Sequence, residues 1–469
     1  MNRWRDRLNN PYLFAFLGEA TLALTFLLYV WIAREFGPEQ YGRFSSAAAL
    51  AGILGVFIQF GLPIFLTRLV AADEQYGPGA FGTFVVLQGI NLLITLLLVQ
   101  ALSSWLTQQG TDRLFLLILI GCEFLRGTKM LLRSVLKGKS WFAAESASVA
   151  GERFFVVLVS GATLILTRDL TAVLLAFGTA RLLEILFTAF ILSRKADLFQ
   201  SVRIRDVRTA YRKGFPFAIH GLLWILYYQL DMVMLQWITT ETEVGFYGAA
   251  YRVMEIFSAL PRVVFHVAFT RFAACAARNP LDLPQKALEA FRVLIWMAIP
   301  VMVLAGSLQK PGMLLLYGEN FRPAILLLAI LLPTLGIKLF SCLCEELLLA
   351  THQEKKLPVL LFWVAASNIG LNLILIPRMG AAGAATATLA SEGVFCSMGL
   401  VMLFRNVIPS ARPAIMRLLV PILGLSTAPS LVLLGFPWMT GLVLGGLCFA
   451  MLIRFQSPRK LFQDLKPEA

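Results

Sequence analysis

The chain has 469 residues, of which 58% are hydrophobic and only 14% charged, and its mean hydropathy is +0.76. Soluble globular proteins average about 45–50% apolar and about 25% charged residues, so this composition excludes an ordinary soluble enzyme and a disordered chain. The formal net charge of +14 leaves nucleic-acid binding open until the basic residues are located. The length is better divided into membrane spans of about 20 residues each than into soluble domains.

Apolar runs recur along the whole chain, separated by short polar or Gly- and Pro-containing turns. Lipid offers no partner to an unpaired backbone group, so each run is predicted to be an α-helix. The predicted helices are residues 12–33, 44–70, 81–102, 113–136, 145–167, 170–193, 214–238, 244–272, 290–309, 322–350, 357–376, 381–405, 413–433 and 435–455. The prediction is an all-α polytopic membrane protein with about 14 transmembrane helices.

The positions of Lys and Arg predict the orientation, because cytoplasmic loops of membrane proteins carry an excess of these residues. With the amino terminus inside, 27 of the 41 Lys and Arg residues fall on the cytoplasmic side and 7 on the outer side. Both termini are therefore predicted to be cytoplasmic. The same topology accounts for the positive net charge, so no nucleic-acid partner is expected.

Two parts of the chain are similar at an offset of 203 residues. The informative coincidences are Gly42 with Gly245 and Thr67-Arg68 with Thr270-Arg271. They predict two six-helix lobes as a parallel repeat, a plan in which transporters place the substrate site between the halves. Chance similarity of two apolar hairpins is the alternative. The predicted organisation is an N-lobe (1–193), a basic cytoplasmic linker (194–213), a C-lobe (214–405), and helices 13–14 with a cytoplasmic tail (406–469).

Three motifs, in order along the chain, resemble those of Wzx-type polysaccharide flippases. They are Arg34-Glu-Phe-Gly-Pro-Glu-Gln-Tyr-Gly42 with Phe60-Gly-Leu-Pro63, Asp231-Met-Val-Met with Val244-Gly-Phe-Tyr-Gly-Ala-Ala-Tyr-Arg252, and Asn372-Leu-Ile-Leu-Ile-Pro-Arg-Met-Gly-Ala-Ala-Gly-Ala-Ala385. The resemblance implies the multidrug/oligosaccharidyl-lipid/polysaccharide exporter superfamily. It further implies transport of a polyprenyl-pyrophosphate-linked glycan, of the O-antigen or exopolysaccharide kind, across the bacterial inner membrane. The implied partners are that glycan, membrane lipids, a polysaccharide polymerase and a chain-length regulator, with no cofactor or metal.

Charged groups within the predicted spans are candidates for function, because such a group costs about 2.5–3.5 kcal/mol on insertion scales and usually faces a cavity or a partner. Glu123, Arg126, Lys129 and Arg133 follow at spacings of three or four and so share one face of helix 113–136. Arg and Lys suit the charged oxygens of a pyrophosphate. The candidate pyrophosphate or cavity residues are Lys129, Arg262, Lys338, Arg126, Arg133, Arg153, Arg181 and Arg252.

Several of these cations also have a purely structural interpretation. Arg126, Arg181 and Arg252 each have a glutamate three residues away, a spacing that suits a neutralising pair on one helix. Lys129, Arg262 and Lys338 lack an acid within four residues and are favoured as ligand contacts. The remaining two, Arg133 and Arg153, could instead extend to the inner interface.

Two further sets concern gating and energy coupling. Arg68 and Arg271, matched by the repeat, are inner-gate candidates, although positive-inside topology also explains them. The acids Glu19, Asp231 and Glu392 have no obvious local partner and are candidates for coupling to a proton or sodium gradient, since a carboxyl group in a low dielectric can exchange a proton. An interhelix salt bridge is equally consistent with each acid.

The sequence contains no nucleotide-binding loop pattern, which disfavours ATP-driven export by this chain alone. The alternatives are a MATE-like cation-coupled antiporter of small molecules and a membrane glycosyltransferase or polymerase. The basic set of intramembrane charges favours an anionic ligand over a cationic drug. The largest predicted outer loop, at about residues 310–322, is small for a catalytic site. We therefore expect a flippase that works by alternating access, and not an enzyme.

Overall fold

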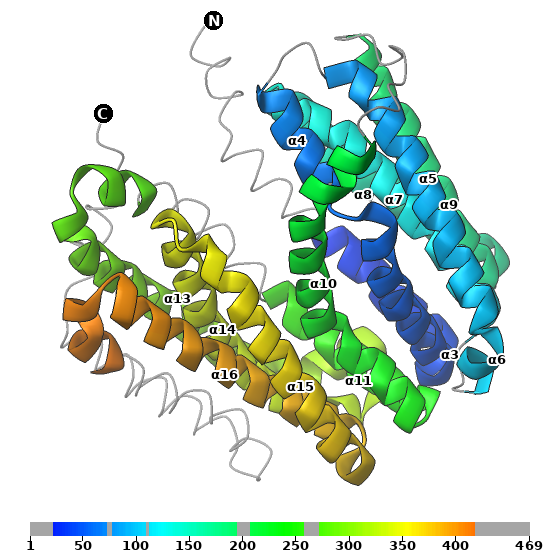
Figure 1. The fold of residues 1–469 in the computed structure, drawn as a ribbon. Helices are drawn as coiled ribbons and strands as arrows, with labels where there is room; N and C mark the ends of the chain where they lie inside the picture. The colour runs from blue at the N-terminus through cyan, green and yellow to red at the C-terminus, as the bar shows by residue number, and fades with distance from the viewer. Residues whose placement is uncertain (1–21, 73–76, 109–111, 195–206, 258–271, 418–469) are drawn as a thin grey trace, which may run out of the picture. The chain divides into compact units, whose positions relative to one another are not determined.

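The computed structural model describes residues 22–72, 77–108, 112–194, 207–257 and 272–417, and these form helices with short connections. The predicted helices 13 and 14 and the candidate residues Glu19, Arg262 and Arg271 lie outside this part, apart from residues 413–417. By proximity the chain forms two compact units, residues 1–245 and 246–469 (Figure 1). This boundary lies within one helix, α11 (Glu241–Phe257), whereas the division into lobes at residues 194–213 stays a prediction.

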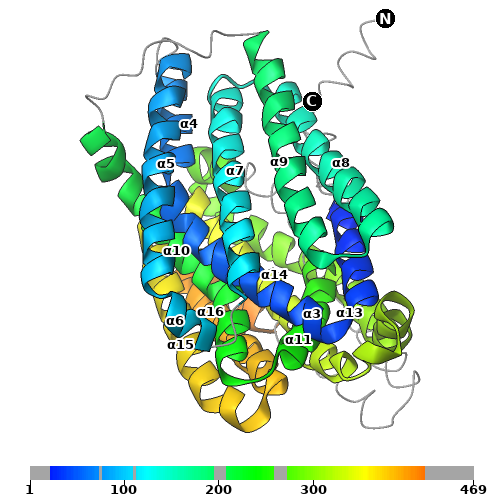
Figure 2. The ribbon, with the colours of Figure 1, turned by 90° about the vertical axis from the view of Figure 1, so that its right-hand side faces the viewer.

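Unit 1 is built around one charged helix. Its elements are α3 (Leu22–Gln59), α4 (Leu62–Ala72), α5 (Gly77–Ala101), α6 (Ser103–Gln108), α7 (Arg113–Gly138), α8 (Phe142–Thr167), α9 (Leu170–Ser193), α10 (Val207–Ile238) and the start of α11. Helix α7 packs against α3, α4, α5 and α9, and α8 packs against α9. Figure 2 shows α7 running between α5 and α9. The helix with the most intramembrane charge is thus surrounded by other helices.

Unit 2 has a core formed chiefly by α14 and α16. Its elements are α13 (Leu283–Tyr317), α14 (Ala324–Ala350), α15 (Leu357–Met379) and α16 (Ala381–Asn406), with the short helices η3 (Pro280–Asp282), η4 (Glu319–Phe321), η5 (Glu354–Lys356) and η6 (Pro409–Ala411). Helix α14 packs against α13 and α16, and α16 also packs against α15. The Phe291 and Phe340 rings stack in this core, with centroids 5.3 Å apart.

Several of the helices agree closely with the apolar runs of the sequence. Eight helical segments of the described residues are long and apolar enough to cross a bilayer. The predicted span 170–193 coincides with α9, and 113–136 differs from α7 by two residues. Helix α10 begins at Val207, so residues 207–213, predicted as the end of the linker, form its first two turns. A polar segment can continue a helix beyond the membrane because water satisfies its exposed backbone groups.

The span predicted as one helix at 44–70 is broken. Helix α3 ends at Gln59 and α4 begins at Leu62, and Phe60 and Gly61 between them have φ of 46° and 69°. Asn91 donates its amide to the Ile58 carbonyl at 3.2 Å and so satisfies a backbone group at the end of α3. The single predicted helix is therefore two helices, and a side chain from α5 holds the break between them.

Two glycines mark a reciprocal close approach of α3 and the first turn of α11. A Cβ atom on Gly42 would overlap the Glu241 carbonyl, and one on Gly245 would overlap the Pro38 carbonyl. At the offset of 203 residues, Gly42 corresponds to Gly245 and Pro38 to Glu241. The two contacts are therefore the same contact made twice, which supports the internal repeat. Glycine is required at both positions because the backbones leave no room for a methyl group.

Candidate functional site: a buried ion network on α7, α8 and α9

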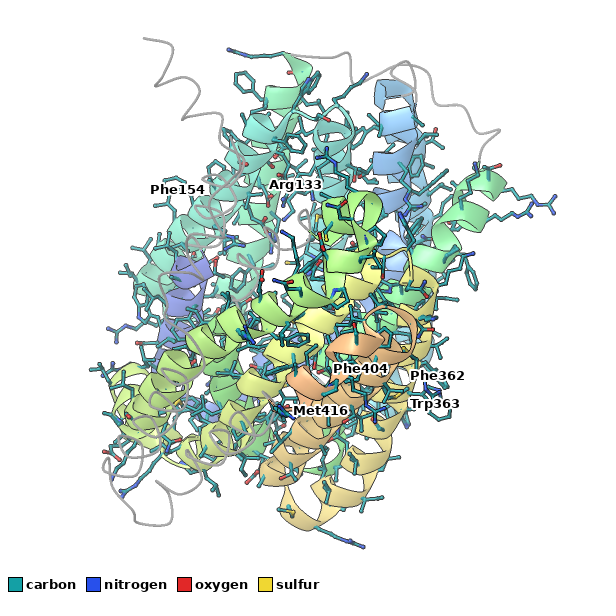
Figure 3. The ribbon with its side chains drawn as sticks, turned by 90° about the vertical axis from the view of Figure 1, so that its left-hand side faces the viewer. Arg133, Phe154, Phe362, Trp363, Phe404 and Met416 are labelled. Atoms are coloured by element: carbon teal, nitrogen blue, oxygen red, sulfur yellow. The ribbon has the colours of Figure 1, made fainter. Side chains whose placement is uncertain are left out.

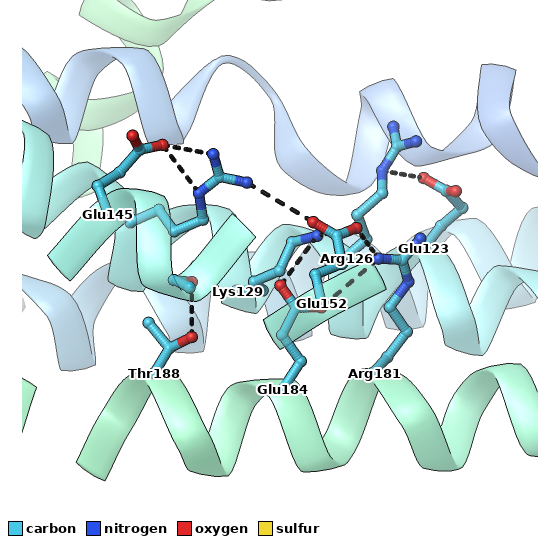
Figure 4. Close-up of polar contacts among 10 residues, drawn as sticks. Glu123, Arg126, Lys129, Glu145, Glu152, Arg181, Glu184 and Thr188 are labelled. Carbon is cyan, nitrogen blue, oxygen red and sulfur yellow. Dashed lines mark hydrogen bonds and ion pairs between the residues drawn. The ribbon is translucent and has the colours of Figure 1, made fainter. Parts of the chain in front are cut away.

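The charged stripe predicted on α7 lies against two other helices that carry acids. Figure 4 shows α7 facing Glu145 and Glu152 of α8 and Glu184 of α9. Because neighbouring turns place residues three and four apart on one face, the α7 cations enter the same interface one above another. The helix-on-helix packing therefore creates a polar layer inside unit 1.

Lys129 occupies the centre of this layer. Its side chain is 2% exposed, and its Nζ lies 2.6 Å from Glu152 Oε1 and 3.3 Å from Glu184 Oε1. Glu184 itself is fully buried. A buried ammonium is tolerated when it is paired and hydrogen-bonded, and the two carboxylates provide that compensation. In this structure Lys129 is an internal ion-pair residue, and a ligand reaches it only if the network opens.

Glu152 connects the cations of two helices. Besides Lys129, it pairs with Arg181 of α9 and lies 3.7 Å from Arg133 of α7. Arg181 also contacts Glu184 at 3.5 Å. One carboxylate therefore joins three cations, and its removal would leave all of them less compensated.

The network continues along α7 in both directions. At one end Arg133 pairs with Glu145, which is also 3.7 Å from Lys137. At the other end Arg126 Nε lies 3.1 Å from Glu123 Oε2. The Arg126 side chain is 36% exposed. Arg126 is more exposed than Lys129 and Arg133, the other two cations of the predicted stripe.

The charges of the central layer balance. Lys129, Arg133 and Arg181 face Glu145, Glu152 and Glu184, so three cations meet three acids. The sequence favours Lys129 as a ligand contact because α7 offers it no acid, but its partners come from α8 and α9. An anion approaching from outside would meet Arg126 and Arg181, 36% and 22% exposed, before Lys129.

The three local pairs that the sequence offered as a structural interpretation are present. Arg126 contacts Glu123, Arg181 contacts Glu184, and Arg252 Nη1 lies 2.9 Å from Glu255 Oε2. The remaining predicted cations lie elsewhere. Arg153 is half-buried on α8, Lys338 is half-buried on α14, and Arg68 is exposed on α4 with its guanidinium 4.7 Å from the centroid of the Phe217 ring.

The two described coupling candidates are both buried. Asp231 on α10 is 1% exposed and Glu392 on α16 is 2% exposed. Glu392 follows Ser391, which accepts a hydrogen bond from the Asn368 amide at 3.1 Å, and Asn368 in turn accepts one from Asn372. A buried carboxyl group beside a polar network is expensive to maintain, which is consistent with a functional role.

The candidates predicted from the sequence do not include the acids of α8. Glu145 and Glu152 are seven residues apart and so lie on one helical face two turns from each other. This spacing matches the basic stripe of α7 and was a usable signal. Glu345 and Glu346 on α14, both half-buried, are also absent from those candidates.

Together these features define a multi-pass, all-α membrane protein with a charge-balanced central layer of ion pairs inside one helical unit. The lipid II flippase MurJ, in an inward closed conformation, has the same fold: the TM-score is 0.71 at 14% identity, over 94% of this chain and 98% of that one. An inward-facing multidrug resistance MATE family transporter of the MOP superfamily gives a TM-score of 0.65 at 16% identity, over 85% and 95%.

Residues 14–273 match the family described as polysaccharide biosynthesis protein, and the chain belongs to that family. Two relatives come from Haloferax volcanii. The probable flippase AglR is 25% identical over 78% of this chain and 76% of its own length. The probable low-salt glycan biosynthesis flippase Agl15 is 24% identical over 79% and 78%. The predicted family resemblance and the all-α polytopic fold are confirmed.

Proposed function

We propose that this protein is a flippase that moves a polyprenyl-pyrophosphate-linked oligosaccharide from the cytoplasmic to the outer leaflet of the bacterial inner membrane. Membership of the polysaccharide biosynthesis family supports the glycan, and the names of the two Haloferax relatives support the flippase activity. The single observation that supports an anionic head group in the substrate is the stripe of Arg126, Lys129 and Arg133 on α7. Arg181 on α9 continues this stripe. A transporter rather than a catalyst fits these findings.

The ion network suggests how an anionic head group would be received. A pyrophosphate carries at least two negative charges and several acceptor oxygens, so it can replace a carboxylate as the partner of an arginine. Arg126 would make the first contact because it is the most exposed cation of the stripe. Arg181 would then release Glu152 and bind the phosphate. This step breaks an ion pair that connects α8 and α9. The acids keep the cations in place until the ligand arrives.

Translocation requires a second state with different affinity for the ligand, because a ligand shifts an equilibrium only by its differential affinity for the two states. We assign the change between these two states to alternating access between the two predicted lobes, with Arg68 and Arg271 at the inner gate. Asp231 and Glu392 would couple the cycle to a proton or sodium gradient, and Glu19 is a further candidate. Both termini are assigned to the cytoplasm, and a polysaccharide polymerase and a chain-length regulator are the proposed partners.

The test is a gene deletion in the host, complemented with variants. Loss of the protein should make lipid-linked glycan precursors accumulate on the cytoplasmic side while surface polysaccharide disappears. Precursors that vanish instead would indicate an earlier synthetic step and would refute transport. Unchanged glycans together with new sensitivity to cationic compounds would indicate a MATE-like antiporter.

Variants then test the head-group contact. Arg126→Gln should reduce surface polysaccharide at an unchanged protein level, since the substitution removes an exposed charge and leaves the central layer intact. Arg322→Gln is the matched control, because Arg322 is also an arginine three residues from a glutamate and is 70% exposed. Equal polysaccharide in the two strains would remove Arg126 from the proposed binding site.

A further inference from the structure

Unit 2 contains a cavity of about 480 Å³ that is separate from the ion network. Its walls are one face of α16, part of α14, and the helical turn 412–417 that follows η6. Phe340, Leu400, Phe404 and Met416 are among the lining side chains, and Figure 3 shows Phe404 and Met416 close together. The volume lies within the range of about 300–1,000 Å³ that is usual for small-molecule sites.

The fold holds the walls of this cavity in place. On α16 the lining residues include Cys396, Leu400 and Phe404, at spacings of four, so the cavity follows one helical face. Opposite them Phe340 is fully buried and stacks on Phe291. Cys396, Leu400 and Phe404 belong to the same hydrophobic core cluster. The apolar wall is therefore part of the packed interior of unit 2.

Two arginines line the same cavity. Arg405 lies in the last turn of α16 and Arg412 directly follows η6. Ile408, Ala411 and Ile415 are buried in the core cluster, so they fix the position of η6 and of Arg412 beside it. Both arginines are exposed, so they present charge at the edge of a chamber that is otherwise mostly apolar. Such a combination matches an amphiphile with an acidic head.

The predicted orientation places this end of α16 at the cytoplasmic face, where the leaflet carries anionic lipids. Basic pockets between transmembrane helices on that side are a recurrent site for acidic lipid head groups. We propose that the cavity binds an anionic glycerophospholipid of the cytoplasmic leaflet, with one acyl chain against Leu400 and Phe404 and the phosphate at Arg405 and Arg412. The cavity volume, equal to about 16 water molecules, accommodates one acyl chain and is small for a long polyprenyl tail.

The experiment measures lipid retention by the purified full-length chain in detergent. The chain is delipidated, titrated with dioleoyl phosphatidylglycerol or dioleoyl phosphatidylcholine, and examined by native mass spectrometry. We expect one phosphatidylglycerol to be retained in preference to phosphatidylcholine. Removing both charges in Arg405→Gln/Arg412→Gln should weaken phosphatidylglycerol binding about 30-fold, given the usual contribution of each basic side chain to binding an acidic lipid.

Matched controls distinguish lipid binding in the cavity from the general effects of losing a surface charge or adding a large side chain. Arg417→Gln removes an exposed arginine five residues beyond Arg412 that does not line the cavity, and it should bind like the wild type. Val401→Trp fills the cavity from a residue that is 49% exposed, whereas Val359→Trp adds the same bulk at a residue that is 53% exposed and outside the lining. Only Val401→Trp should displace the lipid.

Two results would overturn the proposal. Equal phosphatidylglycerol binding by the double arginine variant and the Arg417→Gln variant would show that the cavity does not hold the head group. Displacement of phosphatidylglycerol by an added polyprenyl pyrophosphate, with a photoactivatable prenyl chain crosslinking to residues 393–417, would assign the cavity to a prenyl lipid instead. An acyl-chain diazirine on phosphatidylglycerol that crosslinks to the same residues, undisturbed by polyprenyl pyrophosphate, is the expected outcome.

Discussion

Replacing Lys129 by methionine should destabilise the protein strongly. Methionine keeps most of the volume but removes the charge, and it leaves Glu184, which is fully buried, with Arg181 at 3.5 Å as its remaining cation. Breaking a buried ion pair by removing one partner costs about 3–5 kcal/mol, because the other charge stays buried and is poorly compensated. We therefore expect Lys129→Met to lower the free energy of unfolding by an amount in that range.

Rescue by charge removal distinguishes this explanation from a simple packing defect. In Lys129→Met/Glu184→Gln the central layer loses one cation and one acid, so the remaining charges balance again. More than half of the lost stability should return, since an apolar or neutral replacement of a whole pair is often close to neutral. Unfolding in detergent, followed by tryptophan fluorescence against increasing dodecyl sulfate, provides the measurement. Arg322→Gln is the exposed control and should change the stability by less than about 1 kcal/mol. A double variant no more stable than the single one would refute the electrostatic reasoning.

Two further substitutions test the backbone features of unit 1. Gly245→Ala should destabilise the protein by about 1–3 kcal/mol, because its Cβ would meet the Pro38 carbonyl; Gly89→Ala, with no atom within 4 Å of its Cβ, is the control, and equal unfolding midpoints would contradict the close approach. Asn91→Ala leaves the Ile58 carbonyl without its side-chain donor and should cost about 1–3 kcal/mol in the same assay. Leu93→Ala, at an exposed position of the same helix, is the control. If Asn91→Ala lowers the free energy of unfolding no more than Leu93→Ala does, the helix break does not depend on this hydrogen bond.

The sequence was sufficient for features that depend on one helix at a time. Hydropathy located α9 to the residue, and the spacing of three residues predicted the contact of Arg126 with Glu123. Both follow from local geometry, because a residue's neighbours on its own helix are fixed by the helical period. Hydropathy alone predicts one helix at 44–70 and misses the break at Gly61, although a glycine two residues before a proline is a local signal for the reversal of φ that ends α3.

Contacts between helices could not be predicted from the sequence alone. Lys129 appeared to be unpaired because its two acids belong to α8 and α9, and their distance depends on how deeply and at what rotation these helices pack. The same reason hides the role of Asn91, which satisfies a backbone group 33 positions earlier in the chain. Complementary spacing, as in Glu145 and Glu152 opposite the α7 stripe, narrows the choice of partners but does not determine the rotation of the helices.

The reciprocal contact of Gly42 with Glu241 and of Gly245 with Pro38 has a consequence for how the chain evolved. In a symmetric homodimer, each chain presents the same two residues to the other, and every contact occurs twice. A gene duplication followed by fusion of the copies would retain that pattern within one polypeptide. This reciprocal contact thus has the form of a contact in an ancestral dimer. The two halves that make it are now related by an offset of 203 residues within one chain. Residues 38 and 245, and residues 42 and 241, should then covary among descendants of the duplication as if they belonged to two interacting proteins.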